Sequence, residues 1–387
     1  MVKTGLERLK EISPSWLKED RIGLLCHQAS VDRGLRHAKE VIWEIVGDRL
    51  KALFSPQHGL WGERQANMEG SPDGWDPQLG VPVYSLYGQR RRPKREQLEG
   101  IDTLVVDLQD VGVRTYTYAT TMALCMEEAA KVGIRVVVLD RPNPIGGEQV
   151  EGNLLKEGLR SFVGYAPLPM RHGMTMGELA LFFNTSMKIG AELEVIPMEG
   201  WGRKSFEDTG LPWVMPSPNI PAPETALTYA GQVLLEGTNL SEGRGTTRPF
   251  ELCGAPYIDA SLLLKHLEGK GLPGVIFREA HFIPTFDKWE GEVCHGVQVH
   301  VIDPEAFRPY LTALTLIKAV MELWPEEFSW RPPPYEYETS RLPFDLISGD
   351  PQVRQWLEEG MDPFQMQHLW EEELQYFSEE RSSFLLY

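Results

Sequence analysis

The chain has 387 residues, of which 42% are hydrophobic, 10% aromatic and 24% charged, and its formal net charge is −18. This is the composition of a globular protein with more than one domain, and no stretch approaches the roughly 18 consecutive apolar residues of a membrane span. The acidic balance argues against nucleic acid as a partner, because proteins that follow phosphate backbones carry a surplus of Lys and Arg.

The N-terminus and the cysteines indicate the cellular compartment. Residues 1–7 lead into a charged amphipathic stretch without the apolar core of a secretory signal, so we expect a cytoplasmic protein. The four cysteines are far apart and form no CxxC pair, which indicates reduced thiols and neither a disulfide framework nor a zinc site. The histidines lack HExxH spacing, so we expect no metal.

Strands and helices alternate through the first part of the chain. Apolar runs predict strands over residues 21–26, 51–54, 81–84, 101–108 and 135–139. Between them the pattern favours helices over residues 33–50 and 118–131. Runs of Val, Ile and Leu bounded by glycine are typical of parallel strands covered on both faces. We therefore predict an α/β fold with a Rossmann-like parallel-sheet domain over residues 1–225.

Beyond residue 140 the connections become rich in proline. Thr175 followed by Glu178 has the spacing of a capping box and predicts a helix start. Further strands are expected over residues 192–197, 275–278 and 296–302, and helices over residues 304–323 and 363–380. We interpret residues 226–387 as a smaller α+β domain.

Polar side chains follow four of the predicted strands. They are, in chain order, His27, Gln28, Gln57, His58, Gln109, Asp110, Arg141 and Asn143. Ligands of open parallel sheets bind at the carboxyl ends of the strands, so these side chains predict a site at that edge. For any single strand, a polar cap that satisfies loop amides is the alternative interpretation.

The loop over residues 59–74 carries Glu63 and Asn67. A carboxylate in such a loop is a candidate general acid if burial raises its pKa, although it can equally be a surface charge.

A second loop, residues 234–251, combines closely spaced glycines with Arg244 and Arg248. The planar donors of arginine suit a carboxylate or phosphate, whereas the alternative is a structural turn held by pairs such as Arg248 with Glu251. Gly243-x-Gly245 lacks the strand–helix context of a nucleotide loop, which disfavours a nucleotide-sugar or sugar-phosphate enzyme.

Eight motifs are similar, in the same order, to those of a known family. They are FSPQHG (54–59), VPVYSLYG (81–88), LQDVGVRTYTY (108–118), VLDRPNPIGG (138–147), MRHGMTMGELA (170–180), PMEGW (197–201), GLPWVMPSPN (210–219) and EGTNLSEGRGTTRPFELCGAP (236–256). Across nearly its whole length the chain resembles the DUF1343 family, whose characterised members are exo-β-N-acetylmuramidases of the NamZ type. The resemblance implies a glycoside hydrolase that removes terminal N-acetylmuramic acid from the non-reducing end of peptidoglycan fragments, as in cell wall recycling. It also implies a ligand cleft between the two domains.

One position departs from the family pattern. Where this chain has Gln57, the family carries the glutamate that is its suspected catalytic residue. An amide cannot shuttle a proton, although it can orient an acetamido group or a water. The resemblance then implies that Glu63, Asp110 or Glu242 supplies the catalytic carboxylate, that the glycoside has changed, or that the protein binds carbohydrate without cleaving it. The sequence leaves a retaining or an inverting mechanism open.

The muramyl ligand implied by the resemblance carries a lactyl carboxylate, for which an acidic protein needs a local cation. The expected substrate-binding residues are Gln57, His58, Asn67, Gln109, Arg114, Tyr116, Arg141, Asn143, His172, Asn219, Asn239, Arg244 and Arg248. The arginines are the candidates for the anion clamp, the tyrosine for stacking on a pyranose ring, and the amides for sugar hydroxyls. Neither a metal nor a nucleotide cofactor is expected, and the sequence does not indicate an oligomeric state.

Overall fold

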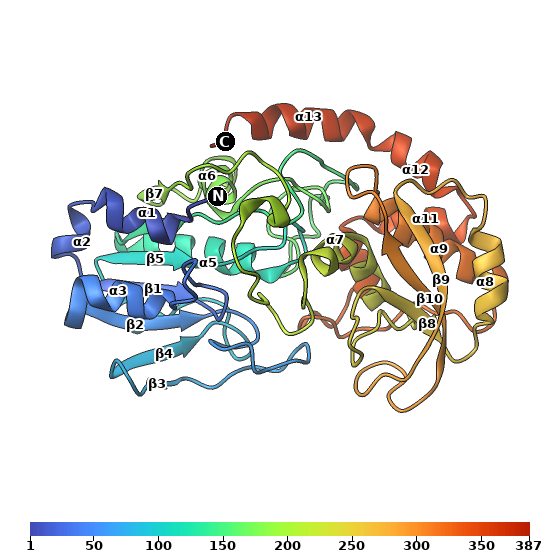
Figure 1. Ribbon diagram of the computed structural model, residues 1–387, viewed down its shortest axis with the longest axis horizontal. Coiled ribbons are helices and arrows are strands. Elements are labelled where there is room, and N and C mark those ends of the chain that lie inside the picture. The colour runs from blue at the N-terminus through green and yellow to red at the C-terminus, as the bar shows by residue number, and fades with distance from the viewer.

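A computed structural model describes residues 1–387 and places two β-sheets in different parts of the molecule (Figure 1). The larger sheet has seven strands in the order β3-β4-β2-β1-β5-β6-β7. Their bounds are β1 (Ile22–Cys26), β2 (Leu50–Ser55), β3 (Gly74–Asp76), β4 (Val81–Ser85), β5 (Thr103–Asp107), β6 (Arg135–Leu139) and β7 (Leu193–Ile196). All neighbours pair in parallel except β3, which runs antiparallel to β4 at one edge. The predicted parallel-sheet α/β fold is confirmed.

Helices cover both faces of this sheet, which is why its central strands are apolar on both sides. On one face Leu24 and Val105 pack with the helices α1 and α3, and on the other Leu25 and Val106 pack with α5 and α6. The helices of this part are α1 (Gly5–Ile12), α2 (Trp16–Glu19), α3 (Ala38–Val46), α4 (Arg95–Leu98), α5 (Thr117–Val132) and α6 (Met176–Ser186), with short 3₁₀ turns over Gly47–Arg49 and Phe206–Thr209.

The C-terminal part contains an antiparallel sheet in the order β8-β10-β9, formed by β8 (Leu252–Ala255), β9 (Val275–Phe282) and β10 (Cys294–Val301). Its helices are α7 (Pro223–Gln232), α8 (Ala260–Leu267), α9 (Pro309–Leu323), α10 (Pro343–Ser348), α11 (Pro351–Glu358), α12 (Pro363–Leu369) and α13 (Glu371–Ser382), with a 3₁₀ turn over Val233–Gly237. Helix α7 packs closely on the start of α9 because residue 231 is a glycine. A Cβ at this position would lie only 1.8 Å from the Pro309 carbonyl oxygen.

Three predicted helices differ from the observed ones. The first begins at Ala38, where the His37 side chain accepts a hydrogen bond from the Lys39 amide and caps the helix. The second begins at Pro309, whose ring suits the first helical turn. The single helix expected over residues 363–380 is wrong, since the chain breaks at Trp370 into α12 and α13. The acidic residues that follow Trp370 favour the positive end of a new helix.

The Thr175 capping box is confirmed: the Glu178 amide donates to the threonine hydroxyl at 3.2 Å, and the threonine amide donates back to the glutamate carboxylate at 3.0 Å. None of the helices combines the length and the apolar composition that crossing a bilayer would require.

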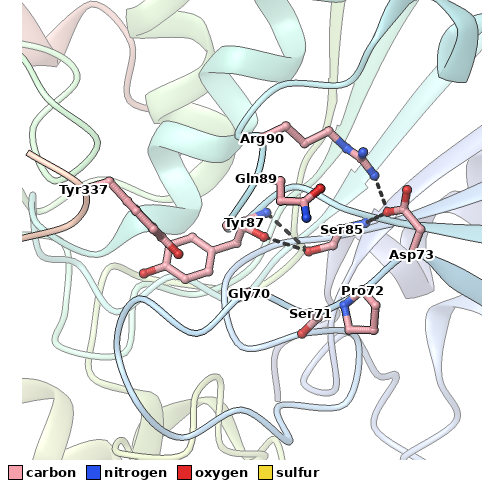
Figure 2. Close-up of a pocket in the computed structure, with 10 residues that line it drawn as sticks. Gly70, Ser71, Pro72, Asp73, Ser85, Tyr87, Gln89, Arg90 and Tyr337 are labelled. Carbon is pink, nitrogen blue, oxygen red and sulfur yellow. Dashed lines mark hydrogen bonds and ion pairs between the residues drawn. The ribbon is translucent and has the colours of Figure 1, made fainter.

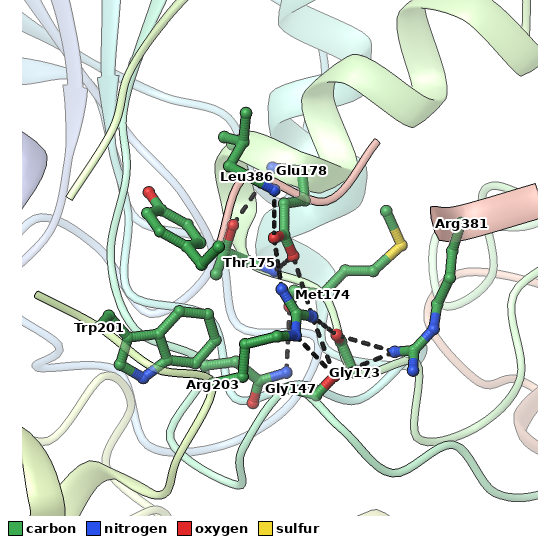
Figure 3. A network of polar contacts seen from close by, with 12 residues as sticks. Gly147, Gly173, Met174, Thr175, Glu178, Trp201, Arg203, Arg381 and Leu386 are labelled. Carbon is green, nitrogen blue, oxygen red and sulfur yellow. Dashed lines mark hydrogen bonds and ion pairs between the residues drawn. The ribbon is translucent and has the colours of Figure 1, made fainter. Parts of the chain in front are cut away.

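The C-terminal segment, residues 371–387, returns to the first part of the molecule, so that both chain ends lie near α6 (Figure 1). Arg381 donates to the carbonyls of Gly147 and Gly173 at 3.1 and 3.0 Å, and the Leu386 amide donates to Glu178 at 3.0 Å (Figure 3). One hydrophobic core also runs through both parts. These hydrogen bonds and the shared core hold the two sheets in a fixed relation to each other.

Candidate active site

The strand order reverses between β1 and β5, which is where open α/β sheets usually bind their ligands. In this protein a loop of the chain itself fills that crevice. The carbonyl of Pro216 lies 3.1 Å from His27 Nδ1 and accepts hydrogen bonds from Gln28 and from the Tyr118 hydroxyl at 3.1 and 2.8 Å. The Gln109 amide donates to His27 Nε2 at 3.0 Å. The polar residues that follow β1 therefore bind protein groups.

Two of the predicted arginines are occupied in the same way. Arg141 forms a buried ion pair with Asp107 at 2.5 Å. Arg114 is buried and donates only to backbone carbonyls, namely those of Asn153, Leu168, Ile347 and Ser348. Burial lowers the pKa of Arg114 to about 10, although Tyr310 and Asp350 act in the opposite direction. Both guanidinium groups are thus bound to the protein itself, and Arg141 borders only a small hollow of about 20 Å³.

Gln109, Asn143 and His172 also form hydrogen bonds with backbone groups of the protein. The Gln109 side chain donates to the Pro142 carbonyl at 2.8 Å, and Asn143 donates to the Met174 carbonyl at 3.0 Å. His172 accepts from the Met174 amide at 3.2 Å.

Two more lie in the C-terminal part. Asn239 donates to the Glu327 carbonyl at 2.8 Å. Arg248 is exposed and pairs with Glu251 at 3.2 Å, as the structural-turn interpretation of this loop expected.

The three carboxylates proposed from the sequence lie apart from one another. Glu63 is exposed, and its carboxylate accepts from the Trp61 amide at 3.3 Å. Asp110 is buried beneath the strand ends, where one oxygen accepts from the Gly112 amide at 2.7 Å and the other has no partner. Glu242 is buried and pairs with Lys288 at 2.6 Å and with Arg244 Nε at 3.2 Å.

A hollow, which we call the inner hollow, lies where the end of β2, the start of α5 and the C-terminal part meet. Six of the predicted residues line it: Gln57, His58, Asn67, Tyr116, Asn219 and Arg244. Tyr118, which the sequence offered as a second aromatic ring for stacking on a pyranose, also lines it. The sequence did not single out the other polar groups on its wall, which are Thr115, Thr117, Ser217, Tyr229, Glu236, Tyr335 and Glu336. Its volume is about 40 Å³, room for a few water molecules.

Glu236 is the first of two carboxylates in this wall. It accepts from Arg244 at 2.7 Å, from the Tyr335 hydroxyl at 2.7 Å and from the Asn67 amide group at 3.1 Å. Arg244 Nη1 has no hydrogen-bond partner, although the side chain is buried. One edge of this guanidinium thus remains free beside the hollow.

Glu336 is the second carboxylate, and it comes from a two-residue hairpin, Tyr335–Glu338. The hairpin is closed by two backbone hydrogen bonds of 2.9 Å between Tyr335 and Glu338. The Tyr87 hydroxyl lies 2.9 and 2.8 Å from the two carboxylate oxygens, and Gln57 Nε2 lies 3.4 Å from one of them. Burial raises the pKa of Glu336 to about 7.

The Gln57 side chain is held on both of its polar atoms. The Thr117 hydroxyl, at the first residue of α5, donates to Gln57 Oε1 at 2.7 Å, and Gln57 Nε2 donates to Tyr87 at 3.1 Å. Beside it, burial lowers the pKa of His58 to about 4, so this imidazole is neutral at pH 7. The amide and the imidazole therefore present fixed, uncharged groups to the hollow.

A larger outer hollow of about 570 Å³ adjoins this site (Figure 2). Its lining residues are Gly70, Ser71, Pro72, Asp73, Ser85, Tyr87, Gly88, Gln89, Arg90 and Tyr337. Gly70 and Gly88 meet backbone to backbone, since a Cβ on Gly88 would lie 2.9 Å from the Gly70 Cα. Tyr87 lines the outer hollow, and its hydroxyl contacts Glu336, which lines the inner one. The hairpin also contributes Tyr337 to the outer hollow. The volume is within the range of small-molecule sites.

Comparisons with known proteins match the chain along its entire length. The family model described as exo-β-N-acetylmuramidase NamZ, N-terminal, matches residues 22–224, and its C-terminal counterpart matches residues 227–387. The chain is 45% identical over 388 residues to the peptidoglycan β-N-acetylmuramidase NamZ of Bacillus subtilis (strain 168), covering 100% of this chain and 91% of the relative.

Two crystal structures of DUF1343 family proteins from Bacteroides fragilis NCTC 9343 are also similar. The first superposes with a TM-score of 0.90 at 35% identity, and the second with a TM-score of 0.78 at 29% identity. In both comparisons the match covers 100% of this chain and 99% of the other.

Proposed function

The chain belongs to the exo-β-N-acetylmuramidase NamZ family, also named DUF1343, and on that basis we propose that it releases terminal N-acetylmuramic acid from the non-reducing end of peptidoglycan fragments. The observation that carries this proposal is the 45% identity to the B. subtilis peptidoglycan β-N-acetylmuramidase over the full chain. The matched residues include both parts of the molecule and hence every segment that lines the two hollows.

The carboxylates of the inner hollow support a glycosidase. Most glycosidases use a pair of Asp or Glu residues on either side of the scissile bond, and this hollow contains Glu236 and Glu336. Only the outer hollow has room for sugar rings, so we place the rings there, with the glycosidic bond at the wall formed by Tyr87 and the hairpin and the substituents of the terminal ring directed into the inner hollow.

The polar groups of the wall also suit a muramyl ligand. Arg244 has a free N–H edge for the lactyl carboxylate, and burial strengthens a charge-assisted hydrogen bond of this kind. Gln57, Asn67 and Asn219 offer amide groups for an acetamido group or sugar hydroxyls.

A second function is favoured by one observation, the amide at Gln57. A protein that kept the hollow but lost turnover would bind muramyl sugars without cleaving them. The presence of Glu336 beside Gln57 argues for hydrolysis, since it returns a carboxyl group to the place where the amide stands.

The test is incubation of the purified protein with a muropeptide disaccharide that ends in N-acetylmuramic acid and with a chromogenic β-N-acetylmuramide. We expect free N-acetylmuramic acid from both, measured by chromatography with mass detection. A fragment with N-acetylglucosamine at its non-reducing end is the matched control and should remain intact. Binding of the muramyl fragment without any release, even at high protein concentration, would favour the second function.

A further inference from the structure

We propose that Glu336, at the tip of the hairpin supplied by the C-terminal part, is the general acid that protonates the glycosidic oxygen. This inference rests on the proposed function, because it assigns a role in that same reaction. It differs from what the sequence suggested, since Glu63, Asp110 and Glu242 do not line either hollow.

The backbone of the hairpin is the first observation behind this assignment. Two-residue hairpins with a type I′ turn need positive φ at both central residues, and for that reason they favour Asn-Gly. Here the two positions are Glu336, with φ 47°, and Tyr337, with φ 63°. Non-glycine residues held in this region are strained, and such strain gathers at functional sites. The strained turn places the Glu336 carboxyl group in the wall of the inner hollow and the Tyr337 ring in the wall of the outer one.

The surroundings of the carboxyl group are the second observation. Glu236, in the same hollow, has Arg244 as an ion-pair partner, whereas Glu336 is buried without any ion pair. The side-chain oxygens of Glu336 contact only Tyr87 and Gln57.

The charges that act on Glu336 from the neighbouring elements are few. Glu236 raises its pKa, whereas Arg91, which donates to the Glu336 backbone carbonyl, lowers it, as does the Tyr87 hydroxyl. The balance with burial brings the pKa of Glu336 to about 7. A carboxyl group of this kind is still protonated near neutral pH, which is the state that a general acid requires.

Gln57 is the third observation. Its amide occupies the position beside Glu336 but cannot give up a proton, so the carboxyl group is the only acid of the Gln57, Tyr87 and Glu336 cluster that titrates near neutral pH. Gln57 and Tyr87 hold the carboxyl group in place.

Glu336 gives its proton to the glycosidic oxygen, and the bond from that oxygen to the anomeric carbon breaks with its electron pair remaining on the oxygen. A water molecule then adds its oxygen to the anomeric carbon. Glu236 accepts the proton that this water loses, and proton exchange with the solvent returns Glu236 and Glu336 to their starting states.

The test compares two leaving groups. In the disaccharide of N-acetylmuramic acid and N-acetylglucosamine the departing sugar oxygen needs a proton, whereas 2,4-dinitrophenyl β-N-acetylmuramide releases a stable phenolate that needs none. For Glu336→Gln we expect kcat/KM to fall by about 10²–10⁴-fold on the disaccharide and by less than about tenfold on the dinitrophenyl substrate. The loss of activity near pH 7 on the alkaline side of the wild-type profile should also disappear.

The matched control is Glu151→Gln, which makes the same change in another buried glutamate. Glu151 accepts from the Leu311 amide at 3.0 Å and lines neither hollow, so both substrates should be cleaved at wild-type rates. Glu336→Asp keeps a carboxyl group and should retain part of the disaccharide activity together with the alkaline limb.

Three results separate the possibilities. Equal losses of Glu336→Gln on both substrates, or no loss on either, would overturn the assignment of Glu336. A wild-type protein that cleaves neither substrate would overturn the proposed function. Retained cleavage of the dinitrophenyl substrate by Glu336→Gln supports the assignment and also shows that the variant is folded.

Discussion

Glu151 and Glu336 are two buried glutamates whose pKa values burial raises to about 7, yet their surroundings differ. Glu151 is packed where the first part of the chain meets the start of α9, accepting a hydrogen bond from Leu311. Glu336 stands on a strained hairpin and lines a hollow. A raised pKa therefore reports burial in both places, and only the cavity and the backbone distinguish a functional candidate from a structural group.

The ends of the sheet strands show the same division. Asp107 ends β5 and Arg141 follows the neighbouring strand β6, and the two form an ion pair with each other, while Gln57 follows β2 and reaches the hollow. The difference arises because the C-terminal part covers the end of β2, whereas the loop at Pro216 fills the crevice between β1 and β5. Polar strand ends thus contribute to a site only where another segment leaves space in front of them.

The largest effect that we expect from this comparison concerns the stability of Glu151→Gln. The folded-state pKa of Glu151 is raised to about 7 from a reference of 4.5, so its contribution to stability is fully present below about pH 4.5 and is lost as the pH rises through about 7. Between pH 5 and pH 8 the free energy of unfolding of the wild type should therefore fall by up to about 3 kcal/mol because of Glu151, and in the variant this part of the fall should be absent. Urea unfolding at several pH values measures this. An unchanged pH dependence would contradict the role of Glu151 as a structural titrating group.

Gln57→Glu tests Glu336 by placing a second carboxylate beside it. A carboxylate beside Glu336 disfavours its ionised form, so the alkaline limb of kcat/KM on the disaccharide should move upward by about 1 to 2 pH units. The pH profile of the wild type is the reference. A downward shift, or a large gain in rate with the limb unmoved, would indicate that the new glutamate has taken over the reaction.

Tyr87→Phe should give a smaller shift in the same direction. The tyrosine hydroxyl stabilises the ionised form of Glu336, so its removal should raise the alkaline limb by less than about one pH unit. Tyr337→Phe is the matched control, because that hydroxyl donates to the Met68 carbonyl at 2.9 Å and not to the carboxylate. Equal shifts in the two variants would remove the hydrogen bond as the cause.

Arg248→Ala should have the smallest effect. Its side chain is 57% exposed and pairs with Glu251 on the surface, and such pairs contribute little to stability. We expect a change below about 0.5 kcal/mol in the free energy of unfolding and an unchanged KM for the muramyl disaccharide. A KM raised several-fold would return Arg248 to the substrate-binding residues.

Much of the fold followed from local patterns in the sequence. The parallel strands are recognisable because burial on both faces demands continuous apolar runs, and the start of α6 because its capping box joins Thr175 and Glu178. Strands β3 and β8 were not predicted, since each has at most four residues and their pairing is decided by contacts distant in the sequence.

The candidate site was predictable in part. Gln57, Asn67 and Arg244 lie in motifs or glycine-rich loops that draw attention to them, and they line one hollow. Glu336 stands in the stretch Pro334-Tyr335-Glu336-Tyr337, where no spacing indicates a catalytic role. Its position depends on a hairpin that meets residues almost 280 positions earlier, and only the tertiary fold reveals such a contact.

The left-handed backbone of the hairpin has a consequence for protein engineering. Turn statistics would replace Glu336-Tyr337 by Asn-Gly and relieve about 1–2 kcal/mol of strain per residue, which raises the melting temperature. If the carboxyl group acts as we propose, the same change ends turnover. Thermostability and catalysis then oppose each other at this dipeptide, and a screen that ranks variants by melting temperature alone would enrich inactive protein.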